Sequence, residues 1–181
     1  MERFNLLVTF HPNQAELAER EVRKRVEDVG GQVEDIERSS IDGVFCVRLA
    51  GDAKQIVSSL HSEFQESPEM LTHTYHWVPI DVWVEADEEV MIDAVKDLAQ
   101  GIGENEKWMM HVHKRHHPKH SEELMLTLTG PISKGKVDLK HPEKVIVVEV
   151  LGGTAGLSLL AKDQLINVNR LRQEIGLTQI I

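Results

Sequence analysis

Apolar side chains recur at strand and helix spacing throughout the first 85 residues. Alternating apolar residues indicate strands, whereas apolar residues three or four positions apart indicate helices. Turn-forming segments such as Gly30-Gly31, Ser39–Gly43 and Ser67-Pro68 separate the patterns. The expected elements are a strand at 3–10, a helix at 15–29, a hairpin of strands at 32–37 and 44–49, a helix at 53–64 capped by Asp52, and one long or bent strand at 71–84 interrupted at Pro79.

A second series of elements begins after Asp87. The expected elements are a helix at 90–98, a strand at 108–112, a helix at 121–128, a buried strand at 145–151, a second apolar strand at 155–161 and a helical pattern at 171–175. Gly152-Gly153 separates the two apolar strands. A tight hairpin is favoured there over a phosphate-binding loop, because such a loop would need a helix after its glycines.

The order of the first elements is βαββαβ, which is the order of a ferredoxin-like unit. An acidic run at 81–89 is the expected domain boundary. We therefore predict an α+β fold with a ferredoxin-like domain at 1–85, an α/β domain at 86–166 and a C-terminal tail at 167–181. Because Ile180-Ile181 gives this tail an apolar end, we expect it to dock a partner enzyme or a second copy of the chain in a homodimer.

Composition limits the classes of function. Of the 181 residues 41% are apolar, which is enough for a packed core, yet no stretch approaches the roughly 18 to 20 apolar residues of a membrane span. We expect a soluble cytoplasmic protein. Cys46 is the only cysteine, which excludes disulfide frameworks and Cys-ligated zinc. The chain also lacks a P-loop, a dinucleotide-binding glycine motif and a Ser-His-Asp order, so we expect no catalytic residue, no cofactor and no enzymatic activity.

The net charge of −10 argues against a polyanionic partner, but the charge is uneven along the chain. Residues 105–144 contain eight Lys or Arg and five Asp or Glu, a balance of +3, which leaves −13 for the remainder. Six of the ten histidines lie in the same window, and each can gain positive charge below about pH 6.5. A polyanion would therefore bind in this window.

Two stretches of the second half resemble the THUMP domain, an RNA-binding module of thiouridine synthases, tRNA methyltransferases and tRNA deaminases. One stretch is Trp108–Arg115, which looks like the strand of that family that ends in a basic pair. The other runs from Lys136 to Val150, with a Val-Asp-Leu element and a proline turn, and continues at 155–160. With the ferredoxin-like first half, the resemblance covers essentially the whole chain.

The resemblance implies a THUMP domain at 86–166 and tRNA as the partner. Family enzymes attach a catalytic domain to this module, so we expect a non-catalytic adaptor similar to the stand-alone THUMP proteins of archaea and eukaryotes. Such an adaptor presents the acceptor stem and the CCA end of tRNA to a separate tRNA cytidine acetyltransferase or another modifying enzyme.

The expected RNA contacts are basic or imidazole side chains inside the positive window. Lys114 and Arg115 end a strand, where successive side chains point to opposite faces, so one of them is free to contact phosphate. The full predicted set is His113, Lys114, Arg115, His116, His117, Lys119, Lys134, Lys136 and Lys140.

Two other functions remain open on the sequence alone. The tract from His111 to His120 could bind a metal ion and serve a metal-dependent hydrolase, although Lys114, Arg115 and Lys119 would repel a cation. No metal ligand is therefore predicted. A ligand-sensing or assembly module is the third alternative, because ferredoxin-like units bind small effectors and associate through sheet edges.

Overall fold

The computed structural model describes residues 1–176, which fold into two compact units. Unit 1 combines residues 3–79 with the segment that begins at Asp163, and unit 2 comprises Ile80–Lys162. The acidic run at 81–89 predicted a boundary after residue 85, and the residues from 167 were expected to form a separate tail. In the structure the first boundary lies between Pro79 and Ile80, and the described part of that tail belongs to unit 1.

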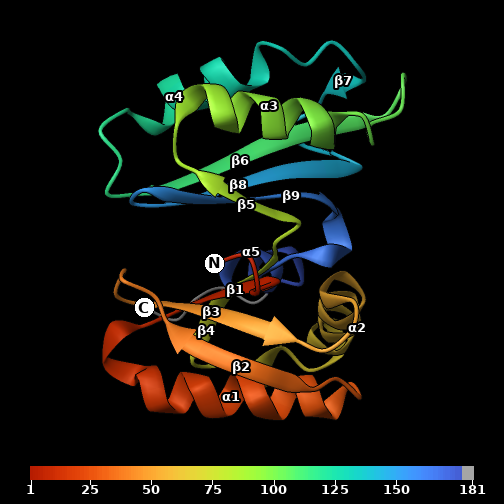
Figure 1. Ribbon diagram of the computed structural model, residues 1–181. Coiled ribbons are helices and arrows are strands. Elements are labelled where there is room, and N and C mark those ends of the chain that lie inside the picture. The colour runs from red at the N-terminus through yellow and green to blue at the C-terminus, as the bar shows by residue number, and fades with distance from the viewer. Residues whose placement is uncertain (177–181) are drawn as a thin grey trace. The chain divides into compact units, whose positions relative to one another are not determined.

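Unit 1 is an antiparallel sheet with helices against it (Figure 1). Its elements are β1 (Leu6–Phe10), η1 (Pro12–Gln14), α1 (Ala15–Asp28), β2 (Val33–Arg38), β3 (Val44–Leu49), α2 (Ala53–Glu66), η2 (Pro68–Met70), β4 (Thr74–Pro79), β10 (Ile166–Asn167) and α5 (Val168–Glu174). The strand order is β10-β4-β1-β3-β2. Its first six strands and helices follow the predicted βαββαβ order, so the ferredoxin-like part of the fold prediction is confirmed.

Local sequence signals explain where the helices of unit 1 begin and end. The Asp52 carboxylate accepts the Lys54 backbone N–H at 2.9 Å and thereby caps α2. After α1, Gly30 adopts a φ of +79°, a left-handed conformation that ends a helix at low cost only when the residue is glycine.

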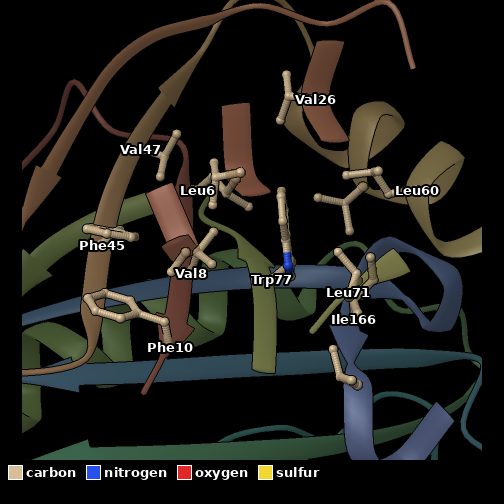
Figure 2. Close-up of a cluster of buried hydrophobic side chains, with 14 of the residues drawn as sticks. Leu6, Val8, Phe10, Val26, Phe45, Val47, Leu60, Leu71, Trp77 and Ile166 are labelled. Atoms are coloured by element: carbon tan, nitrogen blue, oxygen red, sulfur yellow. The ribbon is translucent and has the colours of Figure 1, made fainter. Parts of the chain in front are cut away.

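The core of unit 1 forms around the fully buried Trp77 of β4 (Figure 2). Its indole Nε1 donates a hydrogen bond to the Thr74 hydroxyl at 2.8 Å, which satisfies the one polar atom that the ring buries. Val8 of β1 lies opposite Trp77 in the antiparallel register, and Leu60 of α2 packs in the same cluster. The helices therefore cover one face of the sheet chiefly through apolar contacts.

After unit 2, the chain re-enters unit 1 at Asp163. Ile166 of β10 pairs with Trp77 and is fully buried, and Leu171 of α5 packs in the same core. The Arg172 guanidinium donates to the carbonyl oxygens of Pro68 and Leu71. The last part of the predicted docking tail, residues 177–181, lies outside the described residues.

Unit 2 has a mixed sheet in the order β5-β9-β8-β6-β7. Its elements are β5 (Val82–Glu85), α3 (Glu88–Ala99), β6 (Lys107–Arg115), α4 (Ser121–Thr129), β7 (Lys136–Val137), β8 (Lys144–Leu151), β9 (Thr154–Ala161) and η3 (Lys162–Gln164), whose last two residues lie in unit 1. β6 runs parallel to β7 and β8, and the β8–β9 hairpin turns at Gly152-Gly153 as predicted. Helices α3 and α4 lie on the same face of this sheet (Figure 1). Taken together the units confirm the predicted α+β fold class.

The single strand expected at 71–84 is instead two strands in two different sheets. The pattern breaks at Pro79, and the backbone N–H of Asp81 already donates to the Leu157 carbonyl and the Ser158 hydroxyl of β9. The apolar pattern continues after Pro79 and therefore did not reveal that the chain leaves one sheet and pairs with the other. This change depends on strands that are distant in sequence. Among the described helices, none is long and apolar enough to cross a lipid bilayer.

We predict that Ile166→Ala lowers the free energy of unfolding of unit 1 by about 2 to 5 kcal/mol, because it opens a cavity beside Trp77. The matched control is Ile175→Ala, whose side chain is 38% exposed and whose effect should stay below about 1 kcal/mol. Urea unfolding followed by tryptophan fluorescence measures both. Equal effects of the two substitutions would show that residues after Asp163 are not part of this core.

Candidate nucleic-acid interface

The structure divides the nine predicted RNA-binding residues between the two ends of β6. Lys136 pairs with Lys107 at the first residue of the strand, whereas Arg115 is its last residue. Eight steps of about 3.3 Å separate these ends, a span of about 26 Å. The carboxyl-end group contains His113, Lys114, Arg115, His116, His117 and Lys119, and the amino-end group contains Lys134, Lys136 and Lys140.

Side-chain alternation along β6 then assigns its residues to two faces of the sheet. Trp108 and Met110 pack with the helices, so Lys114, at the same parity, belongs to the helix-covered face. His111, His113 and Arg115 belong to the opposite face. As predicted from the strand position, Lys114 and Arg115 therefore point to different sides.

A fully buried carboxylate organises the carboxyl-end group. Glu149 of β8 is 0% exposed and lies beside His113 in the parallel register. One of its oxygens is 2.8 Å from His113 Nδ1, and the other accepts a hydrogen bond of 2.8 Å from Arg115 Nη1. His113 and Arg115, two of the nine residues expected to contact RNA, thus form hydrogen bonds with a buried carboxylate.

This arrangement shifts the protonation equilibria of both partners. The hydrogen bond to Glu149 raises the pKa of His113 above its usual value, against the opposing effect of burial. Burial acts to raise the pKa of Glu149, but the hydrogen bonds and positive charges of His113 and Arg115 outweigh burial and lower that pKa. The carboxylate therefore stays ionised inside the sheet.

The loop after β6 is also internally paired. Lys114 Nζ donates to the His117 carbonyl at 3.2 Å, and His117 Nδ1 accepts the Lys119 backbone N–H. The Lys119 ammonium lies 2.7 Å from a carboxylate oxygen of Glu88, which raises the pKa of the lysine. His116 is exposed and adopts a φ of +57°, a conformation that non-glycine residues rarely take.

The amino-end group sits on a firmly anchored segment. The Trp108 indole N–H donates to the Lys134 carbonyl at 3.0 Å, which ties the segment to β6. Gly135 has a φ of +69°, and a Cβ at this position would lie 2.6 Å from the Glu106 carbonyl oxygen. Only glycine fits here, so the side chains of Lys134 and Lys136 project from a backbone with little freedom to move.

The ammonium groups of Lys136 and Lys140 have no recorded partner among the described residues, whereas those of Lys114 and Lys134 donate to backbone carbonyl oxygens. Both side chains are exposed. The nearby Asp138 is occupied: its carboxylate accepts the backbone N–H groups of His141 and Lys140, which lower its pKa, and lies 3.4 Å from Lys107 Nζ. Two lysines thus remain available for an external anion.

Local charge balance distinguishes the two ends. At the carboxyl end three cations face three acids, a balance of zero before any histidine is protonated; the residues are Lys114, Arg115, Lys119, Glu88, Glu123 and Glu149. At the amino end five lysines lie with four acids, a balance of +1; the residues are Lys107, Lys134, Lys136, Lys140, Lys144, Glu104, Glu106, Asp138 and Glu143. Phosphate would therefore be attracted more strongly to the amino end.

The histidine tract does not assemble a metal site in residues 1–176, where no three His, Cys, Asp or Glu side chains converge as ligands. The rings of His111 and His113 lie side by side with centroids 6.1 Å apart, but His113 Nδ1 is directed at Glu149. The alternative of a metal-dependent hydrolase therefore gains no ligand set from the described residues.

Comparison with solved structures identifies proteins of the same fold. The chain resembles PH1313 from Pyrococcus horikoshii Ot3, with 17% identity, a TM-score of 0.57, and coverage of 86% of this chain and 54% of that chain. It resembles TrmN from Thermus thermophilus with 18% identity, a TM-score of 0.60, and coverage of 97% and 50%. A predicted N6-adenine-specific DNA methylase from Listeria monocytogenes matches with 10% identity, a TM-score of 0.54, and coverage of 86% and 40%. No family model and no curated protein sequence matches the chain.

These likenesses show that the chain shares its fold with the three proteins. They also correct one prediction: the expectation that the protein is not an enzyme is wrong, because the matched structures include a methylase. That expectation relied on the lack of a catalytic domain after the module. The chain spans only 40 to 54% of the length of these three proteins, so its last residue is no guide to catalysis.

Sequence analysis missed Glu149, the residue that organises the carboxyl-end group. The signal was present: Glu149 is the only charged residue within the apolar run from Val145 to Leu151. A charge in a strand that is buried on both sides requires partners, and this requirement could have directed attention to His113 and Arg115.

We predict that His113 stabilises unit 2 most strongly in mildly acidic solution. Because its pKa is raised on folding, the stabilisation is complete below the ordinary pKa of about 6.5 and disappears as the pH rises through the folded-state value. The pKa of Glu149 is lowered, so its share disappears as the pH falls below about 4.5. The contact should therefore contribute most between about pH 5 and 6.5, and by less than about 1 kcal/mol because the imidazole is partly exposed.

Urea unfolding of His113→Gln from pH 5 to 8.5 measures this effect, and the loss of stability should shrink as the pH rises. His120→Gln, at an exposed position before α4, is the control and should show a difference that does not vary with pH. A pH-independent effect of His113→Gln would contradict the assigned contact.

Proposed function

We propose that this chain binds tRNA and holds it for a modification reaction, with the amino-end lysines of unit 2 as the principal phosphate contacts. The observation that carries this proposal is the pair Lys136 and Lys140, exposed beside an anchored segment and without a carboxylate partner in residues 1–176. Lysines in such positions bind phosphate oxygens through charge and without base specificity.

The acidity of the whole protein is compatible with this proposal. Near physiological salt the Debye length is about 8 Å, so acids beyond that distance are largely screened from the amino-end group. The local balance of +1 then decides the sign of the potential that a phosphate meets. We expect weak binding, because the carboxyl-end cations are already paired with Glu149 and Glu88.

The resemblance and the structural comparison support two reactions. The THUMP resemblance favours acetylation of a tRNA cytidine by an acetyltransferase, whereas the matched methylase favours methyl transfer. In both, unit 2 would hold the acceptor stem and the CCA end while the modifying active site reaches its nucleotide. Supplying tRNA with acetyl-CoA and ATP, or with S-adenosylmethionine, distinguishes the two by the group that is transferred.

We predict that the Lys136→Ala, Lys140→Ala double variant weakens tRNA binding and flattens its salt dependence. Each lost contact with a single-stranded phosphate reduces the slope of log affinity against log salt by about 0.7, so the slope should fall by about 1.4. Filter binding with total tRNA between about 50 and 200 mM salt measures this change.

Lys96→Ala is the matched control, because Lys96 is an exposed lysine of the same unit on helix α3. Its affinity and salt slope should equal those of the unsubstituted protein. If the double variant keeps the original slope, the amino-end group is not the phosphate site. Comparing tRNA with and without its CCA end tests the proposed position of the acceptor end.

A further inference from the structure

The interior of β8 contains one charged residue, Glu149, and its burial needs a physical explanation. Every other residue from Val145 to Leu151 is apolar and buried. Removing a carboxylate from water costs several kcal/mol even after the surroundings relax. Replacing a buried ion pair by apolar residues of similar size is often neutral or stabilising, so the sheet itself does not require Glu149.

The geometry of the contact indicates what Glu149 does instead. Arg115 ends its strand, is 25% exposed, and donates to Glu149 through Nη1 alone. The other N–H groups of this guanidinium have no recorded acceptor within residues 1–176. One hydrogen bond thus restrains the Arg115 side chain while its other donors remain available.

His113 completes this arrangement from the same face. Its Nδ1 is 2.8 Å from the other oxygen of Glu149, so one buried carboxylate restrains two cationic or polar side chains that are two residues apart on β6. Restraining a side chain before binding reduces the entropy that the complex must lose. A planar guanidinium fork fits two oxygens of one phosphate better than a flexible ammonium does.

We propose that Glu149 is a positioning residue that holds Arg115, with His113, as a preorganised site for a phosphodiester of the bound RNA. This inference rests on the proposed function and adds a second contact at the far end of β6, about 26 Å from the amino-end lysines. Lys114 on the other face and the paired Lys119 take no part in it.

A positioning role and simple charge attraction predict opposite changes in tRNA affinity for Glu149→Gln. Glu149→Gln removes a negative charge next to the site, so charge alone predicts tighter tRNA binding. If Glu149 orients Arg115, the same variant binds tRNA about fivefold more weakly, the effect of losing roughly one ordinary hydrogen bond. The control is Glu88→Gln, which removes one carboxylate contact of the half-buried Lys119 and should leave affinity unchanged or slightly tighter.

Filter binding with total tRNA at low salt, on variants that keep the native circular dichroism spectrum, gives the result. Should Glu149→Gln fail to fold, Arg115→Lys decides the question, because it keeps the charge but loses the planar fork and should bind about fivefold more weakly as well. The His113 titration, followed by NMR, should also move to lower pH in Glu149→Gln if that variant folds.

Equal or tighter binding by Glu149→Gln, normal binding by Arg115→Lys, or an unchanged His113 titration would overturn the positioning role and leave the proposed function intact. Failure of the unsubstituted protein to bind tRNA at all would overturn both. The two failures are therefore distinguishable.

Discussion

The parallel pairing of β6 with β8 is the constraint on which the rest of unit 2 depends. It sets Trp108 and Met110 against the helices and directs His111, His113 and Arg115 to the other face. Because side chains alternate strictly along a strand, a shift of one residue in this register would exchange the two sets. The apolar contacts of α3 and α4 therefore determine which polar groups can meet an anion.

The cations at the two ends of β6 differ in whether they have partners within the protein. At the carboxyl end each cation already has a partner within the protein, although Arg115 donates to Glu149 through only one of its nitrogens. At the amino end a tight glycine and an indole hydrogen bond fix the backbone, while Lys136 and Lys140 remain without a carboxylate partner in the described chain. A protein with a net charge of −10 can thus present a cationic surface at a restricted place.

The likeness to longer proteins changes how an absence in the sequence should be interpreted. The lack of catalytic motifs within 181 residues led to the prediction of a non-enzyme, and the matched methylase contradicts that prediction. The described residues therefore inform us about folding and about binding surfaces.

The amino-acid sequence by itself determined the helices, most strands and the ferredoxin-like order, because apolar periodicity and turn residues act within a few positions of one another. It also located the positive window between residues 105 and 144. Only the tertiary structure divided 71–84 between two sheets, returned Ile166 to the first core, separated the predicted cations into two groups and brought Glu149 to His113 and Arg115. Each of these depends on hydrogen bonds or packing between residues distant in sequence, and a local pattern contains no information about which distant partner will be chosen.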